Sequence, residues 1–309
     1  MPAELALALA DVGRAVRAAV GAGPVGATDH AVARVEGGDE LFGVDVRAEV
    51  ALLDAMAAVG RRWPGTLVME GHAAPIVLGG AGGPWRYIAD PVDGSRPWLA
   101  GKRSAWVLIG AGREATTLAD LEVGAAVELP TARAAWALAA WAHRGGEPSA
   151  VDDDLVAGGP PRPVALRPRA TPDLQRAFVT VARFAPGTKA AVGAWEDAVL
   201  AGIETYEDPY LCSGGQLMEL ATGREAAVFD PRPVVGGGFA AHPYDLAAVV
   251  VARAAGVIVE AIPPGPLTAP LDTSTPVAWA GYANEAVAAV LRPRVAAVTP
   301  PATGWPTPR

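Results

Sequence analysis

An apolar strand that runs directly into two acidic residues constrains this 309-residue chain more than any other feature. The strand covers residues 85–89, and Asp90-Pro91-Val92-Asp93-Gly94-Ser95 follows it. Pro91 fixes the backbone between the two acids, and Gly94 and Ser95 open a predicted short helix with Pro97 in its first turn. Carboxylates in this position suit a hard cation such as Mg²⁺, and the N–H groups of a helix start suit a phosphate. The same six residues could instead form a turn with an Asx cap.

Two further acids stand at the ends of predicted elements. Glu70 ends the short apolar run at residues 66–69, and Asp245 lies at the start of a predicted helix over residues 244–255. An Asp at a helix start is often only an N-cap. The four histidines are scattered without zinc-like spacing, and Cys212 is the only cysteine, so the fold does not depend on an internal disulfide.

Helical and strand patterns are interleaved along the chain without a regular βαβ repeat, which predicts a mixed α/β class. Further helices are predicted over residues 3–21, 46–59, 187–202 and 213–223. Further strands are predicted over residues 105–109, 123–129, 178–183 and 226–229. Residues 132–141 fit a strand or a short helix, residues 145–163 a long exposed loop, and residues 293–309 an irregular proline-rich tail.

The net charge indicates which partners the chain can bind and says little about its fold. The net charge of −8 argues against binding to a nucleic-acid polymer or to an anionic membrane. Glu4 stands where a signal peptide would carry a basic residue, and the most apolar late run, residues 246–262, contains Arg253 and Glu260. A cytoplasmic protein without a membrane span is therefore expected.

Residues 107–115 imitate a dinucleotide fingerprint, because a strand is followed by Gly110-Ala111-Gly112. The fingerprint requires a helix after Gly112, and Thr116-Thr117 with a nearby next strand favour a hairpin turn. A dinucleotide-binding enzyme is kept as the weakest of three hypotheses.

Taken in order, five segments resemble the inositol monophosphatase family, part of the metal-dependent, lithium-sensitive phosphatase superfamily. They are residues 43–49, Glu70, residues 90–95, residues 213–223 and residues 244–248. They are similar to the family's early acid before a helix, its Glu-Glu, Asp-Pro-Ile-Asp-Gly-Thr and Gly-Ser/Thr-Ala elements, and its Trp-Asp-x-Ala-Ala element. The resemblance covers nearly the whole chain. It implies an α+β layered sandwich with alternating layers of helices and sheets.

The resemblance also implies two subdomains and the roles of individual residues. An N-terminal subdomain, residues 1–185, would carry most metal ligands, and a C-terminal subdomain, residues 186–309, would complete the site. Two or three Mg²⁺ ions would be held by Glu70, Asp90, the carbonyl of Val92, Asp93 and Asp245. Asp45 and Ser95 would help to activate the attacking water. Phosphate or substrate would be bound by Gly94, Ser95, Ser213, Gly214 and Gly215.

The chain departs from the family pattern at two positions. The family's second glutamate is Gly71 here, and a glutamate that often binds substrate hydroxyls falls on Gly238. The resemblance therefore implies a homodimeric, Mg²⁺-dependent phosphomonoesterase acting on a small sugar, cyclitol or nucleotide phosphate other than inositol monophosphate. The alternative hypothesis is a non-catalytic member that binds metal or phosphate.

Overall fold

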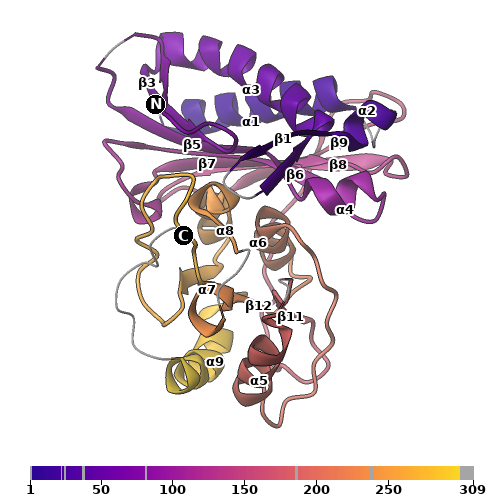
Figure 1. The fold of residues 1–309 in the computed structure, drawn as a ribbon, viewed down its shortest axis with the longest axis vertical. Helices are drawn as coiled ribbons and strands as arrows, with labels where there is room; N and C mark the ends of the chain where they lie inside the picture. Colours follow the sequence, from indigo (N-terminus) through magenta and orange to yellow (C-terminus); the bar gives the residue numbers. More distant parts are fainter. Residues whose placement is uncertain are drawn as a thin grey trace.

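The computed structural model contains a large, mostly antiparallel sheet with the strand order β10-β9-β8-β7-β6-β5-β3-β4 (Figure 1). It describes residues 2–299 apart from 22, 24–25, 37–38, 81, 185–186 and 237–239. The strands are β3 (Gly65–Met69), β4 (Ile76–Leu78), β5 (Trp85–Asp93), β6 (Ala105–Arg113), β7 (Val123–Leu129), β8 (Trp136–His143), β9 (Ser149–Asp154) and β10 (Arg162–Pro163). β3 and β5 are the parallel neighbours in this sheet.

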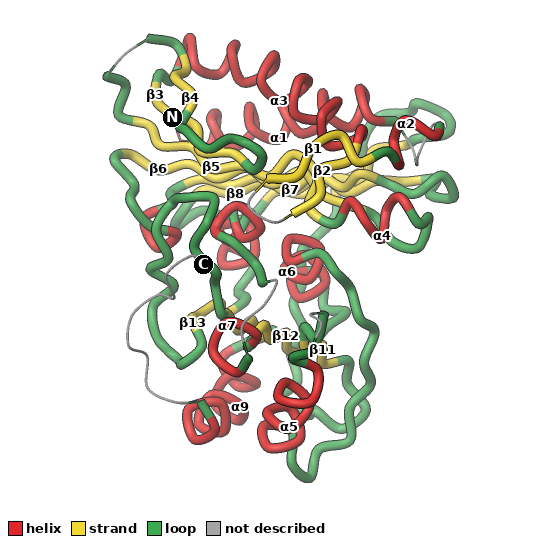
Figure 2. The backbone as a smooth tube through the Cα atoms, in the orientation of Figure 1, coloured by secondary structure: helices red, strands yellow, loops and turns green. Residues whose placement is uncertain are grey.

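Two long helices cover one face of the large sheet. They are α1 (Pro2–Val20) and α3 (Gly43–Arg62), and Figure 2 shows both above the strands. Their apolar faces, which include Leu9 and Leu52, share one buried cluster with alternate residues of β5 to β7. The small hairpin of β1 (Val32–Glu36) and β2 (Asp39–Phe42) and the short helix α2 (Ala27–His30) precede α3. The helices predicted for residues 3–21 and 46–59 are confirmed.

A second sheet has four strands in the order β11-β12-β14-β13. Its strands are β11 (Val179–Val181), β12 (Ala227–Asp230), β13 (Ile258–Ala261) and β14 (Trp279–Tyr282). Its helices are α5 (Lys189–Val199), α6 (Ser213–Ala221), α7 (Arg232–Val235), α8 (Val249–Ala254) and α9 (Glu285–Val298). β11 starts before residue 186, which the sequence suggested as the start of the second subdomain.

The helices α6 and α8 lie between the two sheets, while α5 and α9 lie beyond the second sheet (Figure 1). The order is helices, sheet, helices, sheet, helices, which confirms the predicted alternation of layers. Leu217 of α6 and Val250 of α8 belong to a buried cluster that also contains Leu108 of the large sheet and Val228 of the second. The apolar surface removed from water on both sides of this middle layer holds the two sheets together.

Three expectations need correction. Residues 145–163 were expected to form a loop, but β9 and β10 lie there, and Arg14 and Arg17 of α1 pair with Asp153. Pro293 was expected in an irregular tail, but it lies inside α9, because burial of Leu291 and Val295 outweighs the cost of a proline. The helix predicted over residues 244–255 is divided into the 3₁₀ turn η2 (Pro243–Leu246) and α8. Residues 300–309 lie outside the described part.

Other open points are settled by the strand pairing. Residues 132–141 contribute β8, a strand. β6 continues through Gly112 to Arg113 and pairs with β7 in antiparallel fashion; only the 3₁₀ turn η1 (Leu118–Asp120) intervenes. The dinucleotide fingerprint therefore lacks its helix.

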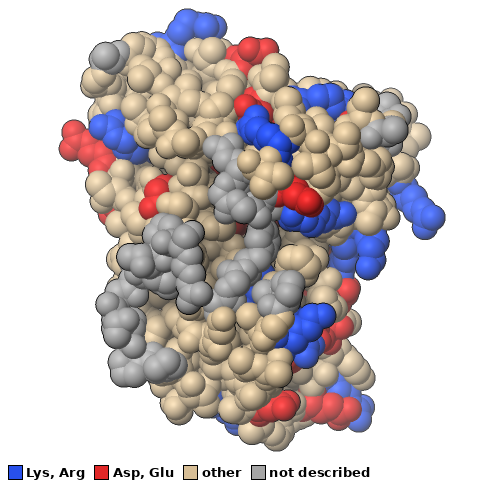
Figure 3. Space-filling model, in the orientation of Figure 1, with Lys and Arg blue, Asp and Glu red and all other residues tan. Residues whose placement is uncertain are grey.

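No helix in the described ranges is both long enough and apolar enough to cross a bilayer. On the face drawn in Figure 3, acidic and basic side chains are scattered over a surface that is mostly uncharged. Asp90 and Asp93 are only 1% and 6% exposed, so part of the acidic charge lies inside the protein.

Gly110 of β6 allows the segment behind Asp245 to lie against the large sheet. A Cβ atom at Gly110 would lie 2.3 Å from the carbonyl oxygen of Ala247. Any side chain there would push away the turn that carries Asp245.

We expect Gly110→Ala to lower the free energy of unfolding by about 1–3 kcal/mol, because overpacking at a backbone contact forces the chain apart. Gly193→Ala in α5 is the matched control: a Cβ there meets nothing within 4 Å. That change should raise the free energy of unfolding by about 0.5–1 kcal/mol. Urea denaturation measures both, and an unchanged midpoint for Gly110→Ala would show that the contact at Ala247 does not hold.

Candidate metal centre

A β-bulge brings Asp90 and Asp93 to the same side of β5. Asp90 is opposite Leu108 of β6 and Asp93 is opposite Trp106, so β5 has one extra residue between them. In a regular strand, residues three apart point to opposite faces of the sheet. The extra residue removes this alternation, and both carboxylates reach the same cavity.

Glu70 and Asp245 enter the same cavity from neighbouring elements. Glu70 follows β3, the parallel neighbour of β5, and its backbone N–H donates to the carbonyl of Ala89 at 3.2 Å. Asp245 lies in η2, where its Oδ2 accepts the backbone N–H of His242 at 2.5 Å. One carboxylate oxygen from each of Asp90, Asp93 and Asp245 lies within 4.8 Å of the other two. The structure thus brings the four predicted acids together, and Val92 also lines the cavity.

Burial makes the ionised forms of Asp90 and Asp93 unfavourable. Burial, followed by the charges of Glu70, Asp93 and Asp245, raises the pKa of Asp90 well above its usual range. Burial also raises the pKa of Asp93 to about 7, although the N–H groups of Gly214 and Ser213 and the thiol of Cys212 oppose the shift. A cation in the cavity would favour the ionised forms of Asp90 and Asp93.

Asp93 is held by the start of α6. Gly214 donates its backbone N–H to Asp93 Oδ2 at 2.5 Å, and Cys212 Sγ lies 3.3 Å from the same oxygen. The N–H of Gly215 bonds Cys212 Sγ at 3.2 Å. The amides of Gly214 and Gly215 thus orient a carboxylate and cap a helix inside the protein. The phosphate-binding role expected of them stays a prediction.

The predicted phosphate side of the cavity is formed by Gly94, Ser95 and Ser213. Gly94 precedes α4 (Ser95–Leu99) and has a left-handed φ of 89°. A Cβ on Gly94 would lie 2.8 Å from Cys212 Cβ, so both backbone conformation and space favour glycine. The predicted short helix after Asp93 is confirmed.

Asp45 lies outside this group. Among the described residues that line the cavity, Asp45 is not present. It is buried in the first turn of α3, where Oδ2 accepts the backbone N–H of Phe42 at 2.6 Å. This contact stabilises the helix start, and the pairing of Asp45 with Ser95 stays a prediction.

Gly71, which stands where the family carries its second glutamate, takes part in a hydrogen-bond network instead. Gly71 has a left-handed φ of 78°, and a Cβ there would lie 2.4 Å from Arg34 Nη2. Arg34 donates to the carbonyl of Gly71 and to Glu49, each at 2.8 Å, and Glu49 also contacts His72 Nε2 at 2.6 Å. A glutamate at position 71 would be strained and would clash with Arg34. Gly238 lies outside the described residues.

Sequence reasoning missed Arg232, which also lines the cavity. Asp230 holds its guanidinium through two contacts, at 2.7 Å and 2.6 Å, and both side chains are buried. Arg232 Nη1 also donates to the carbonyl of Phe184 at 2.8 Å. One sequence feature could have identified Arg232. It lies two residues after Asp230, directly behind the strand predicted at residues 226–229.

No family model matches this chain, and no curated protein matches it. Solved structures match it over almost its whole length. The extragenic suppressor protein suhB from Bartonella henselae shares 17% identity, covers 94% of this chain and 96% of its own, and has a TM-score of 0.66. Inositol monophosphatase from Anabaena (Nostoc) shares 15% identity, covers 96% of both chains and has a TM-score of 0.63. Leishmania major fructose-1,6-bisphosphatase shares 12% identity, covers 95% of this chain and 93% of its own, and has a TM-score of 0.67. The chain therefore has the fold of these structures.

We expect Mg²⁺ to raise the melting temperature of the protein, and to raise it more at about pH 8 than at about pH 6. Without metal, the raised pKa of Asp93 means that the fold loses stability as pH rises through about 7. Below that pH, protons compete with the cation for the same oxygens. A cation at 100 times its Kd adds about 2.7 kcal/mol to the free energy of unfolding.

Asp93→Asn should reduce this response and stabilise the metal-free protein at the higher pH. Asp11→Asn, an exposed residue of α1, is the control and should respond like the natural chain. Differential scanning calorimetry with and without Mg²⁺ measures these shifts. An equal Mg²⁺ response in Asp93→Asn would exclude this cavity as the metal centre.

Proposed function

We propose that this protein is a metal-dependent phosphomonoesterase that hydrolyses a small sugar, cyclitol or nucleotide phosphate. The observation that carries the proposal is the group of three carboxylates, the buried Asp90 and Asp93 and the partly exposed Asp245, beside the start of a short helix. The fold, shared with structures described as inositol monophosphatase and fructose-1,6-bisphosphatase, supports it.

The residues present suit Mg²⁺. The donors are all hard carboxylate or carbonyl oxygens, and the raised pKa of Asp90 reflects burial and then repulsion by neighbouring acids, which a cation would offset. We infer two or three ions, held by Glu70, Asp90 and the carbonyl of Val92 on one side and by Asp90, Asp93 and Asp245 on the other. When bound, such ions polarise the phosphoryl group and lower the pKa of an attacking water.

The other residues of the cavity would position the ester. The N–H groups of Gly94 and Ser95 and the hydroxyl of Ser213 would hold phosphoryl oxygens. The Ser95 hydroxyl, hydrogen-bonded to a carboxylate such as Asp45, would relay the proton of the attacking water. Gly214 and Cys212 would keep Asp93 in one rotamer, so that its oxygens need not reorganise during the reaction.

The size of the cavity limits what it encloses. Its volume is about 90 Å³, and the acids, Gly94, Ser95 and Ser213 line it together. It would hold the phosphoryl group and its ions. The rest of the substrate would lie at the mouth beside Arg96, Phe184 and Leu211, which also line the cavity. The homodimer and the subdomain boundary near residue 185 are proposed from the family resemblance.

The network at Gly71 favours the second candidate, a non-catalytic protein that binds metal or phosphate. A glycine in the left-handed conformation, beside Arg34, stands where the family carries an acid that helps to hold a metal or the attacking water. Binding of Mg²⁺ and of a phosphate ester without phosphate release would identify this case.

We expect the purified protein to release phosphate from members of a sugar, cyclitol and nucleotide phosphate panel only with Mg²⁺, and Li⁺ to inhibit the release. Asp93→Asn should lower turnover about 100-fold or more, since loss of a ligand costs at least as much as loss of a group that supports one. Asp11→Asn should retain full activity. A phosphate assay measures both, and circular dichroism verifies that the variant is folded. Retained activity in folded Asp93→Asn would contradict the proposed metal-dependent mechanism. A preference for inositol monophosphate over the rest of the panel would contradict the proposed choice of substrate.

A further inference from the structure

A second cavity lies beside the metal centre, and none of the predicted functions uses it. Its volume is about 460 Å³. Tyr210 and Gln216 line both cavities, so these two residues lie between the second cavity and the metal centre. The remaining lining residues are Arg103, Phe178, Asp208, Glu219, Arg224 and Glu225.

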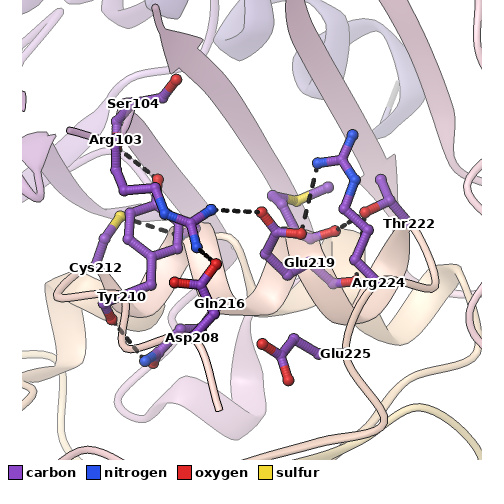
Figure 4. A network of polar contacts seen from close by, with 12 residues as sticks. Arg103, Ser104, Asp208, Tyr210, Cys212, Gln216, Glu219, Thr222, Arg224 and Glu225 are labelled. Carbon is purple, nitrogen blue, oxygen red and sulfur yellow. Dashed lines mark hydrogen bonds and ion pairs between the residues drawn. The ribbon is translucent and has the colours of Figure 1, made fainter. Parts of the chain in front are cut away.

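The charges of the second cavity do not balance. Two arginines face three acids, which leaves one negative charge in excess. Arg103 pairs with Asp208 and lies 3.9 Å from Glu219, and Arg224 lies 3.5 Å from the other oxygen of Glu219 (Figure 4). Both arginines are thus paired with Asp208 and Glu219, and the charges of these four groups cancel. Among the described residues, no arginine forms an ion pair with the third acid, Glu225, which supplies the excess charge when it is ionised.

Glu225 is more than nine-tenths buried and only partly bonded. It is 7% exposed, and its Oε1 accepts the hydroxyl of Thr180 at 3.0 Å. Its Oε2 has no hydrogen-bond partner within the described part of the chain. Figure 4 shows the carboxylate of Glu225 beside α6, directed toward the side on which Asp208 lies. A buried acceptor without a donor is costly, and a ligand with a donor would remove that cost.

The arrangement of the acceptors indicates what kind of ligand fits. Among the residues that the structure describes, only Asp90, Asp93 and Asp245 gather their oxygens closely enough to be grouped as a cation site. The acids of the second cavity are spread over it and are partly neutralised by arginines. Spread acceptors suit an organic cation with several N–H donors better than a compact divalent ion. Phe178, with 45% of its surface exposed, supplies an aromatic face for the same cation.

We propose that the second cavity binds a small organic cation, a primary ammonium or guanidinium group on a short carbon stem, with Glu225 as its main acceptor. The raised pKa of Glu225, about 7, supports this, because burial, followed by the charges of Glu219 and Asp208, disfavours ionisation, and the hydroxyl of Thr180 and the charge of Arg103 only partly oppose the shift. The bound cation would favour the ionised form. It would also lie over the ring of Phe178 at the open side of the cavity.

Isothermal titration calorimetry on the full chain tests the proposal without any need for phosphatase activity. The probes are n-butylammonium and ethylguanidinium chloride, with n-butanol and tetramethylammonium as controls that lack the charge or the N–H donors. The first two should bind, and the controls should bind at least about tenfold more weakly.

Glu225→Gln keeps an acceptor for Thr180 and removes the charge, so affinity should fall about tenfold or more. Glu204→Gln, an exposed acid that does not line the cavity, should bind like the natural chain. Phe178→Ala provides a second variant, with an expected loss of about two- to fivefold. Unchanged affinity in Glu225→Gln with a normal circular dichroism spectrum, equal binding of n-butanol, or displacement of n-butylammonium by Mg²⁺ would overturn the proposal.

Discussion

The rest of this structure depends on the burial of Asp90 and Asp93 in a cavity that Glu70 and Asp245 also line. Like charges removed from water repel each other strongly, and each charge also loses its hydration. The chain meets this cost with a specific arrangement of donors: the start of α6 directs backbone N–H groups at Asp93, and His242 directs one at Asp245. Burial and the neighbouring charges still raise the pKa of Asp90. The fold thus brings the carboxylates together in a place where a cation would favour their ionised forms.

Close backbone approach makes this arrangement possible. A Cβ atom on Gly214 would lie 2.4 Å from the side chain of Leu108 in β6, and a Cβ atom on Gly110 would lie 2.3 Å from the backbone oxygen of Ala247. The first contact places the donors for Asp93, and the second places the turn that contains Asp245. Both contacts involve β6, whose neighbour β5 carries Asp90 and Asp93. The geometry of the cavity therefore depends on one close contact with a buried, packed side chain and one with the backbone.

The sequence predicted the elements that are encoded locally. The apolar run before Asp90, the helix after Gly94 and the amphipathic pattern of α1 each depend on neighbouring residues. Features that depend on distant partners were missed or wrongly predicted. β9 is stabilised through Asp153 by arginines of α1, and α9 tolerates Pro293 because its buried face packs on the second sheet. The four acids were found because each ends or begins an element. Arg232 was missed because its role follows from where β12 places it.

The route of α6 between the sheets has a consequence for how the protein assembles. Asp93 belongs to the large sheet, its N–H donor Gly214 belongs to α6, and Asp245 arrives only after the chain has passed through β12. Residues more than 150 positions apart in the sequence must therefore meet before the cavity exists. Neither sheet forms it alone. Loss of contact between the layers would release any bound cation at once, so retention of the ion reports on the integrity of the whole chain.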